Sequence, residues 1–165
     1  MTKSETNLAA AFAGESQANR KYLAFAKQAE KEGYLQAAKL FRAAAEAETV
    51  HAHMHLRVLG GIKSTRENLL EAIGGETHEF TEMYPQMISE ASAEGAAQAE
   101  RGFTWANEVE KVHAGLYQKM LDSLQQGEAS YDYYICNVCG HTVEREPLEK
   151  CPVCNANKVA FFKAP

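Results

Sequence analysis

Apolar residues recur with a helical period over four long stretches of the chain, and no stretch before residue 130 alternates with the period of a strand. Glycines stand where the helical pattern stops, at Gly33, at Gly60-Gly61 and at Gly127. The pattern predicts long helices over about residues 4–32, 35–59, 76–94 and 96–126. Four long helices with short connections predict an all-α four-helix bundle over residues 1–130.

Two local signals refine the path between the second and third long helices. Ser64 and Glu67 have the spacing of a capping box, which predicts a short extra helix that Gly74-Gly75 would end. Pro85 lies inside the third long helix and has no amide hydrogen, so we expect a kink at this point.

The character of the sequence changes at Tyr131, where an aromatic, strand-like tail begins. Its roughly 35 residues are too few to bury a hydrophobic core of their own. We therefore expect residues 131–165 to form a second domain, a small module of strands and loops that a bound metal stabilises.

Composition and charge exclude several classes of function. The chain has 165 residues, of which 45% are hydrophobic and 24% charged, as is typical of a globular protein. Its net charge of −5 and its lack of a basic face predict no binding to nucleic acid. The first residues lack the apolar core of a signal peptide, and no stretch reaches the roughly 18 apolar residues of a membrane span. We expect a cytoplasmic protein that does not bind membranes.

The second and fourth helical stretches contain an internal repeat. They align without a gap, and Phe, Ala, Glu, Glu, Val, His and Ala recur in register. Each copy carries a Glu-x-x-His motif, Glu48 with His51 and Glu110 with His113. A Glu and a His at this spacing project from the same side of a helix. Apolar residues one and two turns earlier place both motifs on the core side, where carboxylates need a compensating cation.

The other two long helices supply further carboxylates, Glu15 in the first and Glu79 and Glu82 in the third. A Glu from each of two helices and a Glu-x-x-His from each of the other two form the ligand scheme of ferritin-like di-iron proteins. The chain fits this scheme with one carboxylate to spare. Ordinary surface glutamates are the alternative for each motif alone, and the matched repeat favours the metal site. A zinc-protease motif is excluded because Glu82 stands where its second His would be.

All four cysteines of the chain lie in the tail, as two Cys-x-x-Cys pairs. The pairs are Cys136 with Cys139 and Cys151 with Cys154. In a reducing cytoplasm they predict a tetrahedral four-thiolate metal site rather than disulfides. Gly140 and Asn155 follow the pairs, and we expect both to adopt the left-handed backbone conformation. Four thiolates suit iron or zinc, so a structural zinc ribbon stays open.

Taken together, these motifs resemble the rubrerythrin family, and the resemblance covers nearly the whole chain. It rests on Gly14-Glu15-Ser-Gln-Ala, the two Glu/His pairs, Glu79-Phe-Thr-Glu82-Met-Tyr-Pro85 and the cysteine pairs, all in the family's order. Asn155 departs from the glycine that is common after the last cysteine. The resemblance implies a ferritin-like bundle with a di-iron centre, followed by a rubredoxin-like Fe(Cys)4 domain.

The resemblance also implies an activity and partners. The activity is reduction of hydrogen peroxide to water in oxidative-stress defence. Electrons would come from a donor such as rubredoxin or an NAD(P)H-dependent reductase and pass through the Fe(Cys)4 site. The family typically forms homodimers, so we expect a homodimer or a higher homo-oligomer.

Within the di-iron centre, the resemblance implies bridging ligands, ligands of a single iron, and a pair of ligands that exchange on reduction. The bridging ligands are Glu48 and Glu110, the ligands of a single iron are Glu15, Glu79 and His113, and the exchanging pair is Glu82 and His51. Charge supports such an exchange. Two Fe(III) ions carry six positive charges against five glutamates, whereas two Fe(II) ions carry four and need only four carboxylates.

Two other functions stay open from the sequence. A ferroxidase or iron-storage protein related to ferritins would use the same helical ligands, but the spare carboxylate and the four-cysteine electron inlet favour a peroxidase. An interaction module with a zinc ribbon would leave the inward-facing glutamates unexplained.

Overall fold

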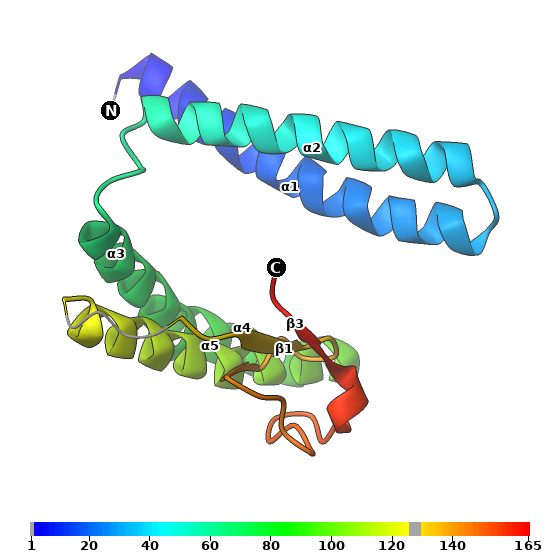
Figure 1. The fold of residues 1–165 in the computed structure, drawn as a ribbon, viewed down its shortest axis with the longest axis vertical. Coiled ribbons are helices and arrows are strands. Elements are labelled where there is room, and N and C mark those ends of the chain that lie inside the picture. Colours follow the sequence, from blue (N-terminus) through cyan, green and yellow to red (C-terminus); the bar gives the residue numbers. More distant parts are fainter. Residues whose placement is uncertain (1, 126–129) are drawn as a thin grey trace. The chain divides into compact units, whose positions relative to one another are not determined.

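The computed structural model describes residues 2–125 and 130–165, and the chain divides between Lys63 and Ser64 into two compact units (Figure 1). The first unit contains the helices α1 (Lys3–Lys31) and α2 (Leu35–Val58). The helical part of the second unit contains α3 (Thr65–His78), the π-helical turn η1 (Glu79–Met83), α4 (Tyr84–Ala93) and α5 (Ala97–Ser123). The expected helix end at Gly127 lies outside the described residues. None of the described helices is long and apolar enough to cross a membrane.

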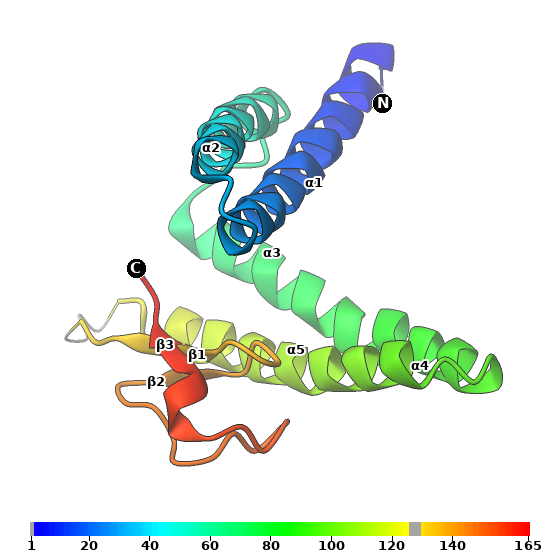
Figure 2. The same cartoon turned by 90° about the vertical axis from the view of Figure 1, so that its right-hand side faces the viewer.

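The helices α1 and α2 form an antiparallel hairpin (Figures 1 and 2). Alanines line their interface, and the most deeply buried, Ala26, Ala38 and Ala45, are at most 1% exposed. Small side chains let the two backbones approach closely. Asn19 of α1 donates a hydrogen bond of 2.7 Å to the Ala45 carbonyl oxygen of α2, which fixes how the helices are aligned.

The turn between paired helices is the same in both units. Gly33 follows α1 and Gly95 follows α4, and their φ angles are 85° and 67°. After each glycine, the amide of the next residue donates to the carbonyl oxygen five residues before it, at 2.8 and 2.9 Å. This is the Schellman arrangement, which a glycine permits without strain. Gly33 matches Gly95 in the same register in which Glu48 matches Glu110, so the repeat found in the sequence extends to the turns.

The path through α3 differs from the sequence prediction. The capping box at Ser64 is present, with the Ser64 hydroxyl accepting a hydrogen bond from the Glu67 amide. Gly74-Gly75 do not end this helix, because both lie inside α3, which continues into η1 and α4. A glycine costs a helix interior roughly 1 kcal/mol relative to alanine. Packing along α5 outweighs that cost here, since α3 and α4 both lie against α5.

The disruption expected at Pro85 takes the form of the π-helical turn η1. Pro85 has no amide hydrogen, and its ring would clash with the carbonyl oxygen four residues earlier in a regular helix. The Tyr84 amide donates instead to the Glu79 carbonyl oxygen, five residues back. A π-helical turn holds one more residue than an α-helical turn, and such turns are common at functional sites.

The C-terminal module is a three-stranded antiparallel sheet in the order β2-β1-β3. Its elements are β1 (Tyr133–Cys136), β2 (Thr142–Glu144), the 3-10 helix η2 (Lys158–Ala160) and β3 (Phe161–Lys163). The sheet lies beside α5 of the same unit (Figure 2). Lys119 of α5 forms an ion pair of 2.6 Å with Glu144 of β2, and the Tyr131 hydroxyl donates to the same carboxylate. The ion pair joins the module to the helix, and the Tyr131 hydrogen bond orients the Glu144 carboxylate within the module.

We expect Glu144→Gln to weaken this contact in a pH-dependent way. The Lys119 ammonium group and the Tyr131 hydroxyl hold the pKa of Glu144 below its usual value. A carboxyl group with a lowered folded-state pKa stabilises the protein above its unfolded-state pKa of about 4.3. That contribution is lost as the pH falls through the lower folded-state pKa. Because Lys119 is half-exposed, we expect a loss of about 0.5–1 kcal/mol at neutral pH.

Urea unfolding of wild type and variant measures this difference in free energy of unfolding at pH 7 and at successively lower pH. The difference should shrink below about pH 4. Glu146→Gln, at an exposed position in the same loop region, is the matched control and should change stability little at any pH. A difference for Glu144→Gln that stays constant with pH would contradict the role given to the ion pair.

Candidate metal centres

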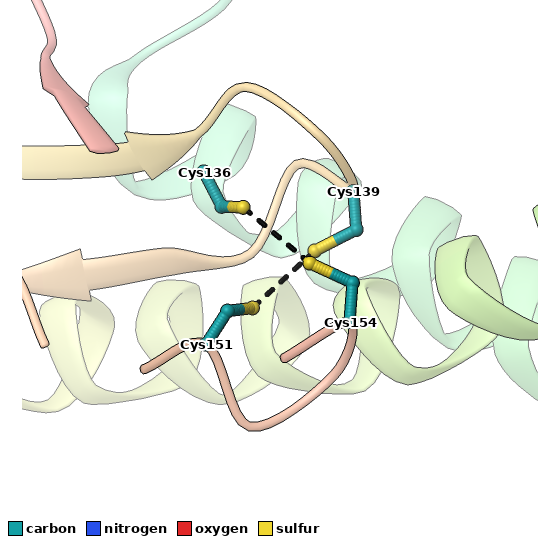
Figure 3. Close-up of side chains that lie close together, drawn as sticks. All are labelled: Cys136, Cys139, Cys151 and Cys154. Atoms are coloured by element: carbon teal, nitrogen blue, oxygen red, sulfur yellow. Dashed lines mark hydrogen bonds between the residues drawn. The ribbon is translucent and has the colours of Figure 1, made fainter. Parts of the chain in front are cut away.

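The sulfur atoms of the four predicted cysteines meet in the C-terminal module (Figure 3). Cys136 ends β1 and Cys139 lies in the loop after it, whereas Cys151 and Cys154 lie in the loop before η2. The Sγ atoms of Cys136 and Cys154 are 3.7 Å apart, and those of Cys139 and Cys151 are 3.5 Å apart. Sulfurs placed tetrahedrally about 2.3 Å from a metal are roughly 3.8 Å apart. The sulfur spacing therefore fits a single four-coordinate ion.

The backbone of each cysteine loop supports this arrangement. Gly140 and Asn155 have φ angles of 86° and 61°, which confirms the left-handed conformation predicted for both. Their amides donate to the carbonyl oxygen of the first cysteine in each pair, at 2.8 and 3.0 Å. Burial opposes ionisation of the Cys136 thiol, but hydrogen bonds from the Val138 and Cys139 amides outweigh it and hold the Cys136 pKa below its ordinary value. The first loop thus stabilises the thiolate of Cys136, the form of cysteine that binds metal. Burial raises the pKa values of Cys139 and Cys154, a cost that a bound cation would offset.

Two groups of carboxylate and imidazole side chains lie on the helices, one in each unit. The first group is Glu15, Glu48 and His51, and the second group is Glu76, Glu110 and His113. In each group, the three ligand atoms lie within 4.8 Å of one another. The histidine Nδ1 atom is 2.9 Å from the nearer carboxylate in the first group and 2.7 Å in the second, and 3.9 Å from the other carboxylate in both. The two groups therefore have matching internal geometry.

Glu76 is the member of these groups that the sequence analysis missed. It occupies in α3 the place that Glu15 has in α1, and both residues follow a glycine. In the gapless register of the repeat, however, Glu15 falls opposite Thr77, and Glu76 stands one position earlier. A repeat search that allowed one inserted residue would have found Glu76.

The π-helical turn accounts for this shift in register. After η1 the second copy of the repeat returns to its original register. Tyr84 of α4 then matches Tyr22 of α1 at the same offset that pairs Glu48 with Glu110. Each tyrosine ring packs against a phenylalanine of the next helix in its unit. The ring centroids of Tyr22 and Phe41 are 6.2 Å apart, and those of Tyr84 and Phe103 are 6.3 Å apart. The additional residue that a π-helical turn accommodates therefore restores the repeat after Glu76.

The structure places the other two glutamates of this segment differently from the ligand set taken from the sequence. The Glu82 side chain is 73% exposed and pairs with His78 at 3.5 Å. Glu79 is partly buried and lies near Glu76, although it is outside the three-residue groups found among the described residues. Three residues advance an α-helix by about 300°, so each such step turns a side chain about 60° away from the one before it. The π-helical turn over Glu79–Met83 changes this angle further, so Glu76, Glu79 and Glu82 do not all face one side.

The second group concentrates negative charge in a partly buried place. Burial, together with the charge and hydrogen bond of Glu110 and the charge of Glu79, raises the pKa of Glu76 to about 7. A cation among these carboxylates would relieve both the repulsion and the cost of burial. Carboxylate oxygen and imidazole nitrogen are ligands that suit iron. Both helical groups therefore have a donor set that fits an iron ion.

Two tyrosines stay protonated beside the second group. Burial and the nearby carboxylates of Glu110 and Glu76 raise the pKa values of Tyr84 and Tyr117 above the ordinary value. Both phenols therefore keep a proton that they can donate at neutral pH.

Comparison with known proteins agrees with these sites. The family model described as Rubrerythrin matches residues 6–121, and the one described as Rubrerythrin, rubredoxin-like domain matches residues 134–162. The chain is 36% identical over 170 residues to Rubrerythrin-2 of Clostridium acetobutylicum, covering 93% of this chain and 92% of that protein. It is 35% identical to nigerythrin of Nitratidesulfovibrio vulgaris, covering 94% of this chain and 83% of that one.

Solved structures of a related protein are similar to this chain over nearly its whole length. Nigerythrin in its mixed-valent state and in its fully reduced, all-ferrous state matches 99% of this chain, with TM-scores of 0.59 and 0.60 at 34% and 33% identity. These matches cover 88% of the nigerythrin chain. They agree with the predicted fold class, ferritin-like helices followed by a small four-cysteine module. With carboxylate and histidine groups on its helices and four cysteines in its tail, this chain belongs to the rubrerythrin family, iron-binding oxidoreductases with a ferritin-like and a rubredoxin-like domain.

Proposed function

We propose that this protein reduces hydrogen peroxide to water, using iron held by the two helical groups and electrons delivered through the four-cysteine site. The observation that carries the proposal is the presence of both kinds of site in one chain: two matched carboxylate and histidine groups, and four cysteines spaced for one metal ion. The iron redox states named for the nigerythrin structures support redox chemistry in this family.

The proposed ligands combine the sequence and the geometry. One iron would be held by Glu15, Glu48 and His51, and the other by Glu76, Glu110 and His113. Glu79 serves as the additional carboxylate in place of Glu82, because it lies near Glu76 whereas Glu82 is paired with His78 on the surface. The charge count is unchanged by this revision, because the revised set again contains five carboxylates. Five suit the two oxidised irons, and four suit the two reduced irons.

The reaction needs two electrons and two protons for each hydrogen peroxide, whose O–O bond breaks to give two water molecules. Iron held by the helical groups would supply the two electrons. Tyr84 and Tyr117 keep their protons beside the second group and are placed to donate hydrogen bonds or protons there. An external donor, such as rubredoxin or an NAD(P)H-dependent reductase, then restores the electrons through the four-cysteine site. We expect the working protein to be a homodimer or a higher homo-oligomer.

Rapid mixing tests the reaction. We expect anaerobically reduced protein to be reoxidised rapidly by hydrogen peroxide, with the visible absorption of the oxidised four-cysteine iron returning as electrons leave it. The measurement is stopped-flow absorption at increasing concentrations of peroxide. Reduction to water is checked by the stoichiometry, one peroxide consumed for every two electrons lost by the protein. A reduced spectrum that peroxide leaves unchanged would rule out this reaction.

The same protein tests the alternative of iron handling. A ferroxidase or storage protein would consume many added Fe(II) ions per chain with oxygen and retain them as a mineral. We expect instead that iron bound per chain saturates once the helical groups and the four-cysteine site are filled. Continued uptake beyond that point, with no reaction with peroxide, would favour the ferritin-like alternative.

A further inference from the structure

Thr142 connects a helical metal group with a cysteine loop inside the second unit. Its hydroxyl oxygen lies 2.9 Å from Nε2 of His113 on α5 and 3.1 Å from the carbonyl oxygen of Gly140. Gly140 directly follows Cys139. Thr142 opens β2, which pairs with β1 in the sheet and packs against α5. The hydroxyl is therefore fixed between the two sites by the packing of the module.

Counting protons determines the direction of each hydrogen bond. A threonine hydroxyl has one proton to donate and can also accept, whereas a carbonyl oxygen can only accept. The contact with Gly140 therefore uses the Thr142 proton. The contact with His113 then requires the hydroxyl to accept, so Nε2 of His113 must carry a proton. The contacts of Thr142 therefore place a proton on Nε2 of His113.

The other ring nitrogen then has the form that binds metal. A neutral imidazole with a proton on Nε2 has a free lone pair on Nδ1. His113 Nδ1 lies 2.7 Å from Glu110 Oε2 and 3.9 Å from Glu76 Oε1. Two acceptors approach this closely only with a proton or a cation between them, so a metal ion bound here would take the place of a proton on Nδ1. Metal-binding histidines commonly donate their second N–H to a fixed acceptor, which sets the tautomer and the ring orientation. Thr142 is such an acceptor, and it comes from the cysteine module rather than from a helix.

We propose that Thr142 is a positioning residue that holds His113 as an Nδ1 metal ligand and links it through Gly140 to the four-cysteine loop of the same chain. The inference rests on the proposed function only in taking His113 to be a metal ligand. It adds that the cysteine module helps to build the helical metal centre, besides carrying electrons. It also provides a path of short covalent and hydrogen-bonded steps from Cys139 to His113 within one chain.

Thr142→Val and Thr142→Ser test this role. Valine keeps the shape of threonine but cannot accept a hydrogen bond, whereas serine keeps the hydroxyl. Lys119→Ala is the matched control, because it removes another polar contact between α5 and β2 and leaves the Thr142 hydroxyl in place. All variants are made in the full chain, and each is loaded either with iron or with diamagnetic zinc.

The first readout is nitrogen-15 NMR of histidine side chains in the zinc-loaded protein. We expect the wild type to show His113 with metal on Nδ1 and an Nε2–H that exchanges slowly with water. Thr142→Val should speed this exchange at least tenfold, Thr142→Ser should restore it, and Lys119→Ala should leave it slow. The second readout is the affinity of the helical site for metal, which should fall about 10- to 100-fold in Thr142→Val alone.

The third readout is the reduction potential of the helical iron, which should shift in Thr142→Val and not in Lys119→Ala. If His113 binds metal but its Nε2–H exchanges equally fast in wild type and Thr142→Val, and affinity and potential are unchanged, the role of Thr142 is overturned while the proposed function stands. If no variant, including wild type, shows metal bound to His113, both the proposed ligand and this inference are overturned.

Discussion

Glu76→Gln is expected to remove iron from the second helical group and to abolish reoxidation of the reduced protein by hydrogen peroxide. Glutamine has nearly the shape of glutamate but no charge, so the group loses one of its two anionic ligands while the fold is preserved. Replacing a mere hydrogen-bond partner of a metal ligand typically costs about 10- to 100-fold in affinity or activity, and the loss of a ligand should cost more. Iron analysis and stopped-flow mixing with peroxide measure the two effects.

Glu82→Gln is the matched control for this experiment. Glu82 lies further along the same helical segment and is 73% exposed, so its replacement should leave iron content and peroxide reactivity near those of the wild type. The sequence alone favoured Glu79 and Glu82 as ligands, whereas the structure brings Glu76 beside Glu110 and His113. Full iron content in Glu76→Gln with iron lost from Glu82→Gln would show that the structure-based assignment is mistaken.

Cys151→Ser is expected to remove the metal of the C-terminal module and to stop turnover driven by an external electron donor. Cys151 is completely buried, and the module is too small to fold on its own core. Metal binding in small sites of this type contributes about 10–16 kcal/mol that acts as folding free energy. The variant should lose the visible absorption of an Fe(Cys)4 site, and the module should become sensitive to proteases.

The reaction of the helical iron with peroxide should survive Cys151→Ser when the protein is reduced chemically before mixing. This separates delivery of electrons from the reaction with peroxide. Asn155→Gly is the control, because glycine accepts the φ of 61° found at this position and should keep the metal. Donor-driven turnover at the wild-type rate in Cys151→Ser would exclude the four-cysteine site from the electron path.

Much of this protein follows from its sequence because the signals are local. Helical periodicity and glycines after the helices were enough to predict α1, α2 and the start of α5 to within a few residues. Two Cys-x-x-Cys pairs predicted the four-cysteine cluster, since short loops leave little freedom in where the sulfur atoms lie. Glu48, His51, Glu110 and His113 stood out because a matched repeat is visible without knowledge of the neighbours.

Only the tertiary structure decided which third-helix glutamate joins Glu110 and His113. Glu76, Glu79 and Glu82 are equally spaced, and the side that faces the neighbouring helix depends on α5 and on the π-helical turn before Pro85. Packing along α5 also overrode the break expected at Gly74-Gly75. The contact between Thr142 and His113 joins residues far apart in the chain, and no local pattern specifies it. Helix period and cysteine spacing are properties of short segments, whereas the orientation of a side chain toward another element is set by packing.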